Sequence, residues 1–160
     1  MERIWYSLIK EAKKKINVHE IPPFIEYGNS SCAILTDSNN IYTGVSIKSN
    51  SGISNSAEKS AIINMINSGE HIITKMVILN ELEELIRPSV DCLEYLLDLG
   101  TSYGDIEILL DYDTQETKRI IEILPDWWGT YRNKKWFTTI TSTIYTQKCK
   151  WLFFIDTLYV

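Results

Sequence analysis

Apolar residues in the first part of the chain recur every three or four positions, which is the spacing of one face of a helix. This spacing predicts an amphipathic helix over residues 2–16. The apolar face of that helix consists of Trp5, Leu8, Ile9, Ala12 and Ile16. Pro22 and Pro23 follow and cannot continue the helix, because proline lacks a backbone N–H group and clashes with the preceding turn.

Two apolar segments around a polar turn predict an antiparallel hairpin. Residues 32–35 are continuously apolar and residues 41–46 alternate in part. Between them, residues 37–40 read Asp-Ser-Asn-Asn, a composition typical of a turn. The following stretch, residues 48–55, is rich in Ser and Asn and is predicted to be a loop.

Helical and strand patterns alternate in the middle of the chain. Asn55 and Ser56 are suitable N-caps for a helix whose apolar face ends near Gly69. Residues 76–79 and 106–110 are apolar without alternation, as expected for strands buried on both faces. Because each of these strands follows a helical segment, the pattern predicts an α/β fold, a three-layer α/β/α sandwich with a central mixed five-stranded sheet.

Composition places the chain among ordinary folded proteins of one domain, with 160 residues, 44% of them hydrophobic and 23% charged. A net charge of -5 argues against a nucleic-acid partner, because neutralising phosphates requires an excess of Lys and Arg on one face. No window of about eighteen apolar residues is present, so no membrane span is expected. The first ten residues also lack the apolar core of a secretory signal.

The cysteines favour a reducing compartment. Cys32, Cys92 and Cys149 form an odd set without paired spacing. Since disulfide frameworks use paired cysteines in oxidising compartments, we expect a reduced, cytoplasmic protein.

Two short motifs carry the candidate chemistry. The first is Ser56-Ala57-Glu58, and the second, about thirty residues later, is Pro88-Ser89-Val90-Asp91-Cys92. They resemble the His/Cys-x-Glu and Pro-Cys-x-x-Cys motifs of the cytidine deaminase family, in which three side chains hold Zn²⁺ and the glutamate transfers protons. Glu58, the proline and Cys92 match the family pattern, whereas serines occupy the other two ligand positions.

The resemblance to the cytidine deaminases extends over residues 1–129 and implies a deaminase-like domain of that extent. Besides the two motifs, it includes the hairpin at 32–44, the strand at 75–79, the helix at 93–100, the strand at 106–110 and the Glu-Ile-Leu-Pro element at 122–125. The C-terminal extension, residues 130–160, contains a β-prone run and a strongly apolar run. We expect this extension to pack on the domain or on a neighbouring subunit.

The resemblance implies a catalytic glutamate without a standard zinc centre. Glu58 matches the proton-transferring residue, and Cys92 matches the last zinc thiolate. Ser56 and Ser89 stand at vestigial ligand positions, since a serine hydroxyl stays protonated at neutral pH and is a poor zinc ligand. Zinc is therefore expected only if the site is functional, and no other cofactor is expected. Purely structural interpretations stay open: a first-turn acid for Glu58, a small buried residue for Cys92 and helix caps for the serines.

No nearby residue is expected to replace the missing zinc ligands. His19 is predicted to lie in a loop before the first strand, and His71 at the end of the helix that follows the first motif. Asp91 is adjacent to Cys92 but fills a non-ligand position of the family motif.

The residues expected to contact a substrate also depart from the family. Ser46 and Lys48 stand where nucleoside-binding members place an Asn and a Glu on the ribose. Asn50 is a further candidate contact, and Trp127 is a candidate aromatic wall over a bound base. The alternatives are a turn role for Asn50 and core or subunit packing for Trp127.

Two main hypotheses about function follow. The first is a non-catalytic, cytidine deaminase-like pseudoenzyme that keeps a pocket for a nucleoside-like small molecule or has a role in assembly. The second is an active hydrolase that deaminates a cytosine-like or other aminated heterocycle through an unusual metal site. For both, the resemblance and the apolar tail predict a homodimer or homotetramer, with no nucleic-acid and no membrane partner. A third hypothesis, a structural subunit of a hetero-oligomer, rests on the apolar tail alone.

Overall fold

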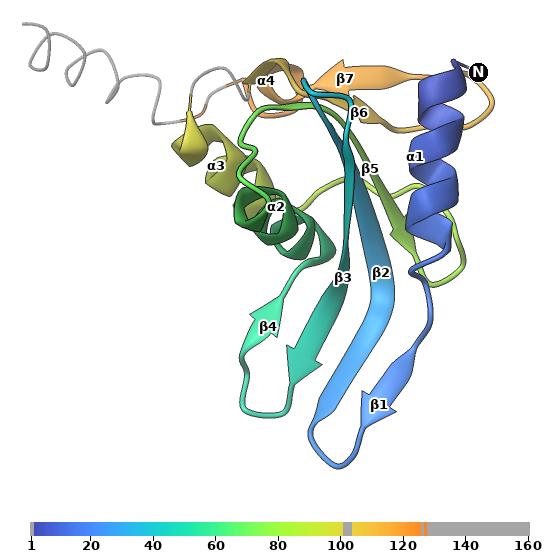
Figure 1. Cartoon of the computed structure of the whole chain (residues 1–160), viewed down its shortest axis with the longest axis vertical. Coiled ribbons are helices and arrows are strands. Elements are labelled where there is room, and N and C mark those ends of the chain that lie inside the picture. Colours follow the sequence, from blue (N-terminus) through green and yellow to red (C-terminus); the bar gives the residue numbers. More distant parts are fainter. Residues whose placement is uncertain (1, 101–103, 126, 128–160) are drawn as a thin grey trace, which may run out of the picture. The chain divides into compact units, whose positions relative to one another are not determined.

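The computed structural model describes residues 2–100, 104–125 and 127. The chain divides into two compact units, Met1–Pro125 and Asp126–Val160, and the fold described below is that of the first unit (Figure 1). The predicted packing of residues 130–160 lies outside the described residues. No helix in the described part of the chain is both long and apolar enough to cross a membrane.

Helices and strands alternate along the first unit. In chain order the elements are α1 (Arg3–Lys13), β1 (His19–Ile21), β2 (Ile25–Thr36), β3 (Ile41–Ser49), β4 (Ser54–Asn55), α2 (Ala57–Asn67), β5 (Ile73–Asn80), α3 (Val90–Leu99), β6 (Glu107–Leu109), β7 (Thr117–Arg119) and α4 (Ile120–Ile123).

The sheet is mixed, as predicted, but it is larger than predicted. Its strand order is β4-β3-β2-β5-β6-β7, with β1 paired to β2. The pair β5 and β6 is parallel, and the other pairs are antiparallel. The described residues thus contain a seven-stranded sheet where five strands were predicted.

Three strands that were not located from the sequence, β1, β4 and β7, are short and mainly exposed, so no apolar pattern marks them. Strand β1 includes His19, which was predicted to lie in a loop, and all of its residues are exposed. Strand β4 occupies the last two residues of the predicted loop at 48–55 and pairs with Ile47 and Lys48. Strand β7 has the sequence Thr-Lys-Arg. Such strands form because a neighbouring strand offers unpaired backbone groups, which a periodicity argument does not detect.

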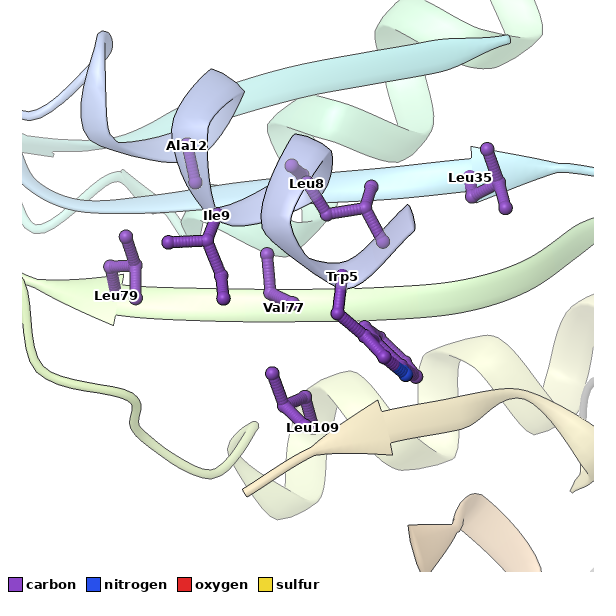
Figure 2. Close-up of a cluster of buried hydrophobic side chains, with 9 residues drawn as sticks. Trp5, Leu8, Ile9, Ala12, Leu35, Val77, Leu79 and Leu109 are labelled. Atoms are coloured by element: carbon purple, nitrogen blue, oxygen red, sulfur yellow. The ribbon is translucent and has the colours of Figure 1, made fainter. Parts of the chain in front are cut away.

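Helix α1 covers one face of the sheet, and α2 and α3 cover the other, which confirms the α/β/α layering (Figure 1). The core under α1 is the apolar cluster drawn in Figure 2. Its buried members are Trp5, Leu8, Ile9 and Ala12 from α1, Ala33 and Leu35 from β2, Val77 and Leu79 from β5, and Leu109 from β6. Because side chains alternate along a strand, Cys32 and Ile34 of β2 lie on the opposite face, toward α2 and α3.

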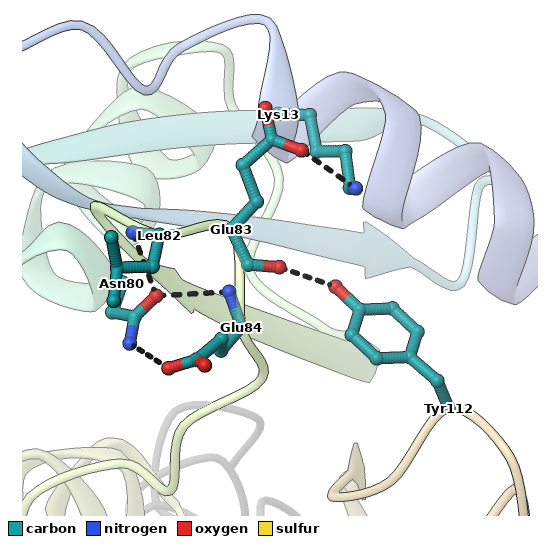
Figure 3. A network of polar contacts seen from close by, with 6 residues as sticks. All are labelled: Lys13, Asn80, Leu82, Glu83, Glu84 and Tyr112. Atoms are coloured by element: carbon teal, nitrogen blue, oxygen red, sulfur yellow. Dashed lines mark hydrogen bonds and ion pairs between the residues drawn. The ribbon is translucent and has the colours of Figure 1, made fainter.

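A polar network closes the edge of the α1 layer (Figure 3). Lys13 at the end of α1 pairs with Glu83 at 2.7 Å, and the hydroxyl of Tyr112 donates to the backbone oxygen of Glu83 at 2.9 Å. The side-chain oxygen of Asn80 accepts from the backbone N–H groups of Leu82 and Glu84. The turn after β5 is thereby tied both to α1 and to the segment that follows β6.

Gly44 lets α2 contact the sheet at very short range. A Cβ atom at this position would overlap the backbone of Ala57 and Ala61 and would lie 2.7 Å from the carbonyl carbon of Ser60. Since β3 has no side chain here and the facing helix residues are alanines, the first turn of α2 lies directly on the strand. This close approach positions the first motif over the sheet.

Candidate functional site

Both serines of the motifs begin a helix. Ser56 has extended backbone angles and its hydroxyl accepts from the N–H group of Lys59 at 3.2 Å. Ser89 has the same conformation, and its hydroxyl accepts from the N–H group of Cys92 at 3.3 Å. A cap of this kind stabilises a helix by about 1 kcal/mol. Both serine oxygens therefore already serve the helices that they begin.

The starts of α2 and α3 meet directly. The side-chain oxygen of Ser56 and the sulfur of Cys92 are 3.0 Å apart and form a hydrogen bond in which either atom can donate. The two motifs, separated in sequence by the whole of α2 and β5, are thus brought together at two neighbouring helix N-termini.

Glu58 lies in the first turn of α2 and is only 5% exposed. The position is electrostatically suitable, because the free N–H groups of a helix N-terminus favour a negative charge. Its charge also acts on the neighbouring thiols. Burial, and next the charge of Glu58, raise the pKa of Cys92, while Ser56, Ser89 and Lys59 partly offset the rise.

Sequence analysis missed Cys32 as a member of this site. Cys32 is fully buried in β2, and its pKa is well above the ordinary value, first because of burial and then because of Glu58 and Cys92. The signal that could have found it is the alternation along β2, which places Cys32 on the sheet face that α2 covers. Both Cys32 and Cys92 are free cysteines, and raised pKa values keep them as neutral thiols near pH 7.

The donor set does not fit a zinc ion. A catalytic zinc site usually has three protein ligands, and its cysteines bind as thiolates. Here Cys92 is the one cysteine of the motif, and it is hydrogen-bonded to Ser56 at one of the two ligand positions that hold serine. Within residues 2–100, 104–125 and 127, no group of three or more His, Cys, Asp and Glu residues is arranged to hold a metal ion. Asp91 is exposed on α3.

The predicted substrate residues have local structural contacts. The hydroxyl of Ser46 accepts from the N–H group of Ser30 at 3.0 Å, bridging β3 and β2. Lys48 is exposed and pairs with Ser54 of β4. The alternation of β3 places Ser46 and Lys48 on the same sheet face as Gly44, toward α2. Their proposed roles in substrate binding stay predictions.

The two other candidate substrate contacts lie in different settings. The backbone N–H group of Asn50 donates to the oxygen of Phe24 at 3.0 Å, and its side-chain nitrogen donates to the oxygen of Pro23 at 3.2 Å. Asn50 therefore fastens the turn after β3 to the turn before β2. Trp127 belongs to the second unit, and its role as an aromatic wall also stays a prediction.

Comparison of the sequence with protein-family models and with curated proteins found no match. Solved structures do match the fold. Cytidine deaminase from Mycobacterium tuberculosis is 20% identical, with a TM-score of 0.64, over 78% of this chain and 97% of that chain. Cytidine deaminase from Mycobacterium leprae is 18% identical, with a TM-score of 0.62, over 76% and 98%. The cytidine deaminase from Bacillus anthracis is 18% identical, with a TM-score of 0.61, over 84% and 93%.

The chain therefore has a cytidine deaminase-like fold, as the motifs predicted. The matched regions include almost the whole length of the three deaminases. Identities of this size establish the architecture, and function has to be argued from the site.

Proposed function

We propose that this chain is a cytidine deaminase-like protein that has lost zinc-dependent hydrolysis and binds a nucleoside-like small molecule without converting it. The observation that carries the proposal is the hydrogen bond of 3.0 Å between Ser56 and Cys92. It pairs a vestigial ligand position with the one remaining cysteine of the motif. The oxygen of Ser56 also caps α2, and the oxygen of Ser89 caps α3.

The high pKa of water supports a loss of catalysis, because water must be deprotonated before it can attack the ring. Hydrolytic deamination needs a nucleophilic hydroxide, and zinc supplies it in this class by lowering the pKa of bound water to about 7. Neutral hydroxyls and thiols do not produce such a change. Glu58 alone can accept a proton, but it does not make water a strong nucleophile at neutral pH.

The same residues suit recognition of a cytosine-like ring. A carboxylate accepts hydrogen bonds, and the exocyclic amino group of such heterocycles donates them. Glu58 is buried between the sheet and a helix N-terminus, where a hydrogen bond to a charged group is stronger than in water. A ligand held this way would stay intact because no activated water reaches it.

Metal content and activity test the proposal together. We expect the purified protein to contain no stoichiometric zinc and to leave cytidine unchanged. The double substitution Ser56→Cys and Ser89→Cys supplies two thiols beside Cys92, and we expect this variant to bind about one zinc ion per chain. Ser68→Cys, at the other end of α2, is the matched control and should bind none. Equimolar zinc in the unsubstituted protein would contradict the proposal, and a folded double variant without zinc would contradict the site geometry.

One observation favours the second hypothesis, an active deaminase with an unusual metal site. Cys32 adds a second buried thiol whose pKa responds to both Glu58 and Cys92. Under this hypothesis the unsubstituted protein would release ammonia from an aminated heterocycle. That activity would disappear in Glu58→Gln, which keeps the shape of the side chain and removes the proton acceptor.

A further inference from the structure

Within residues 2–100 and 104–125, the outer edge of strand β3 is covered only in part. Its inner side pairs with β2 from Ile41 to Val45 and again from Ile47 to Ser49. On its outer side, β4 pairs only with Ile47 and Lys48. Among the described residues, no strand covers the outer side of β3 from Ile41 to Ser46. An edge of this kind is open to pairing with another extended chain.

The direction of the unused backbone groups follows from two observed hydrogen bonds. The N–H group of Ser49 donates outward to the oxygen of Ile53 at 3.0 Å, and the oxygen of Thr43 accepts from the side chain of Asn64 on α2 at 2.8 Å. Because backbone groups alternate in direction along a strand, odd-numbered residues of β3 direct their groups outward. Val45 therefore presents both its N–H and its C=O group at the open edge.

A pocket of about 400 Å³ lies between this edge and α2. Gly44 lines it through its backbone, at the point where α2 lies against β3. Ile47 and Ile63 line it and are 40% and 43% exposed. Ser60 also lines it, and its hydroxyl oxygen is buried without a hydrogen-bond partner among the described residues. The pocket therefore offers apolar surface beside the open backbone groups.

The rim of the pocket carries a positive charge. Lys15 lines the pocket and is exposed. In the part of the chain that the structure describes, no carboxylate lies within ion-pair distance of its ammonium group. An acidic group on an incoming chain would complement this charge.

We propose that the outer edge of β3 docks an extended peptide segment of a partner protein. The segment pairs with Val45 as an added strand, places an aliphatic side chain between Ile47 and Ile63, and directs an acidic side chain toward Lys15. Added strands obtain affinity from backbone hydrogen bonds and specificity from pockets for alternate side chains. A second copy of β3 fits less well, because residues 41–47 carry no acidic side chain for Lys15. This docking site is independent of the function proposed for Glu58 and Cys92.

Peptide selection with a backbone-blocking variant tests the docking site. Random peptides of about eight residues, long enough for one strand, are displayed on phage, selected on the full chain and counter-selected on Val45→Pro. Proline removes the outward N–H group and leaves the pairing with β2 intact, so the edge position tolerates it. We expect selected peptides to alternate aliphatic and polar residues, to include an acidic residue, and to bind Val45→Pro about tenfold or more weakly.

Two controls separate docking from a folding defect. Val45→Thr keeps the N–H group and the branched side chain, so it should bind within about twofold of the unsubstituted chain. A selected peptide methylated on alternate backbone nitrogens should lose binding to the unsubstituted protein, which needs no protein variant. Failure to select peptides, equal binding to Val45→Pro, or full binding of the methylated peptide would overturn the proposal. Self-association that Val45→Pro abolishes would also overturn it, in favour of a second copy.

Discussion

The two faces of the central sheet bury different kinds of side chain. Between the sheet and α1, the buried cluster is apolar and includes Trp5 and Leu8. Between the sheet and α2, burial extends to Glu58 and to the thiols of Cys32 and Cys92. Removing apolar groups from water stabilises a fold, whereas burying a carboxylate costs free energy unless its partners compensate. Both faces therefore contribute apolar burial to stability, and the α2 face in addition buries polar groups that stability alone does not favour.

The largest effect is expected on the α1 face. Leu8 is fully buried, so Leu8→Ala should lower the free energy of unfolding by about 2–5 kcal/mol, through lost apolar burial and the cavity that remains. Urea unfolding measures this change. Tyr6→Ala, on the same helix but 63% exposed, is the matched control and should change stability by less than about 0.5 kcal/mol. Equal effects of the two substitutions would contradict the assignment of the core to this face.

A smaller loss of stability is expected from a substitution where α2 touches the sheet. Gly44→Ala places a methyl group against the backbone of α2, and overpacking of this kind typically costs about 1–3 kcal/mol. The helix has to shift, so the contact between Ser56 and Cys92 should also weaken, which NMR chemical shifts of the α3 start would report. Gly104→Ala is the matched control, since the nearest atoms to its Cβ would lie at an ordinary 3.7 Å. An unchanged stability of the Gly44→Ala variant would show that α2 does not pack directly on β3.

The smallest expected change in stability depends on pH. The pKa of Cys32 in the folded protein lies well above its ordinary value of 9.0. Below pH 9.0 the thiol is protonated in both the folded and the unfolded chain, so it causes no loss of stability there. Above that pH only the unfolded chain releases the proton, and stability should fall by up to about 1.4 kcal/mol per pH unit. Denaturant unfolding should show this slope, reduced in Cys32→Ala. An identical slope in both proteins would contradict the burial of Cys32.

Much of the fold is predictable from the sequence because buried apolar residues recur with the period of the helix or strand that they belong to. The spacing of Trp5, Leu8 and Ile9 predicts α1, and the apolar runs predict the last part of β2 and the central parts of β5 and β6. Ser56 and Ser89 predict where α2 and α3 begin, since capping is a local interaction. The apolar pattern does not detect strands β1, β4 and β7, because they are short and exposed. Only their backbone pairing with a neighbouring strand defines them.

The site is predictable only in part. The motifs locate Glu58 and Cys92, but the contribution of Cys32 depends on which face of β2 meets α2. The hydrogen bond between Ser56 and Cys92 likewise depends on the distance between two helices, which is a tertiary property. The open edge of β3 follows from the short length of β4, and no residue type in the sequence indicates it.

The contact between Ser56 and Cys92 has a consequence for how the molecule opens. A structural zinc site contributes about 10–16 kcal/mol to holding its ligands together, whereas a hydrogen bond contributes about 1 kcal/mol. The hydrogen bond that joins the starts of α2 and α3 is therefore weak, whereas the sheet that the two helices cover is well packed. Segments joined so weakly separate in local fluctuations that leave the rest of the fold intact. Loss of the contact between Ser56 and Cys92 is accordingly expected to require no unfolding of the α1 core.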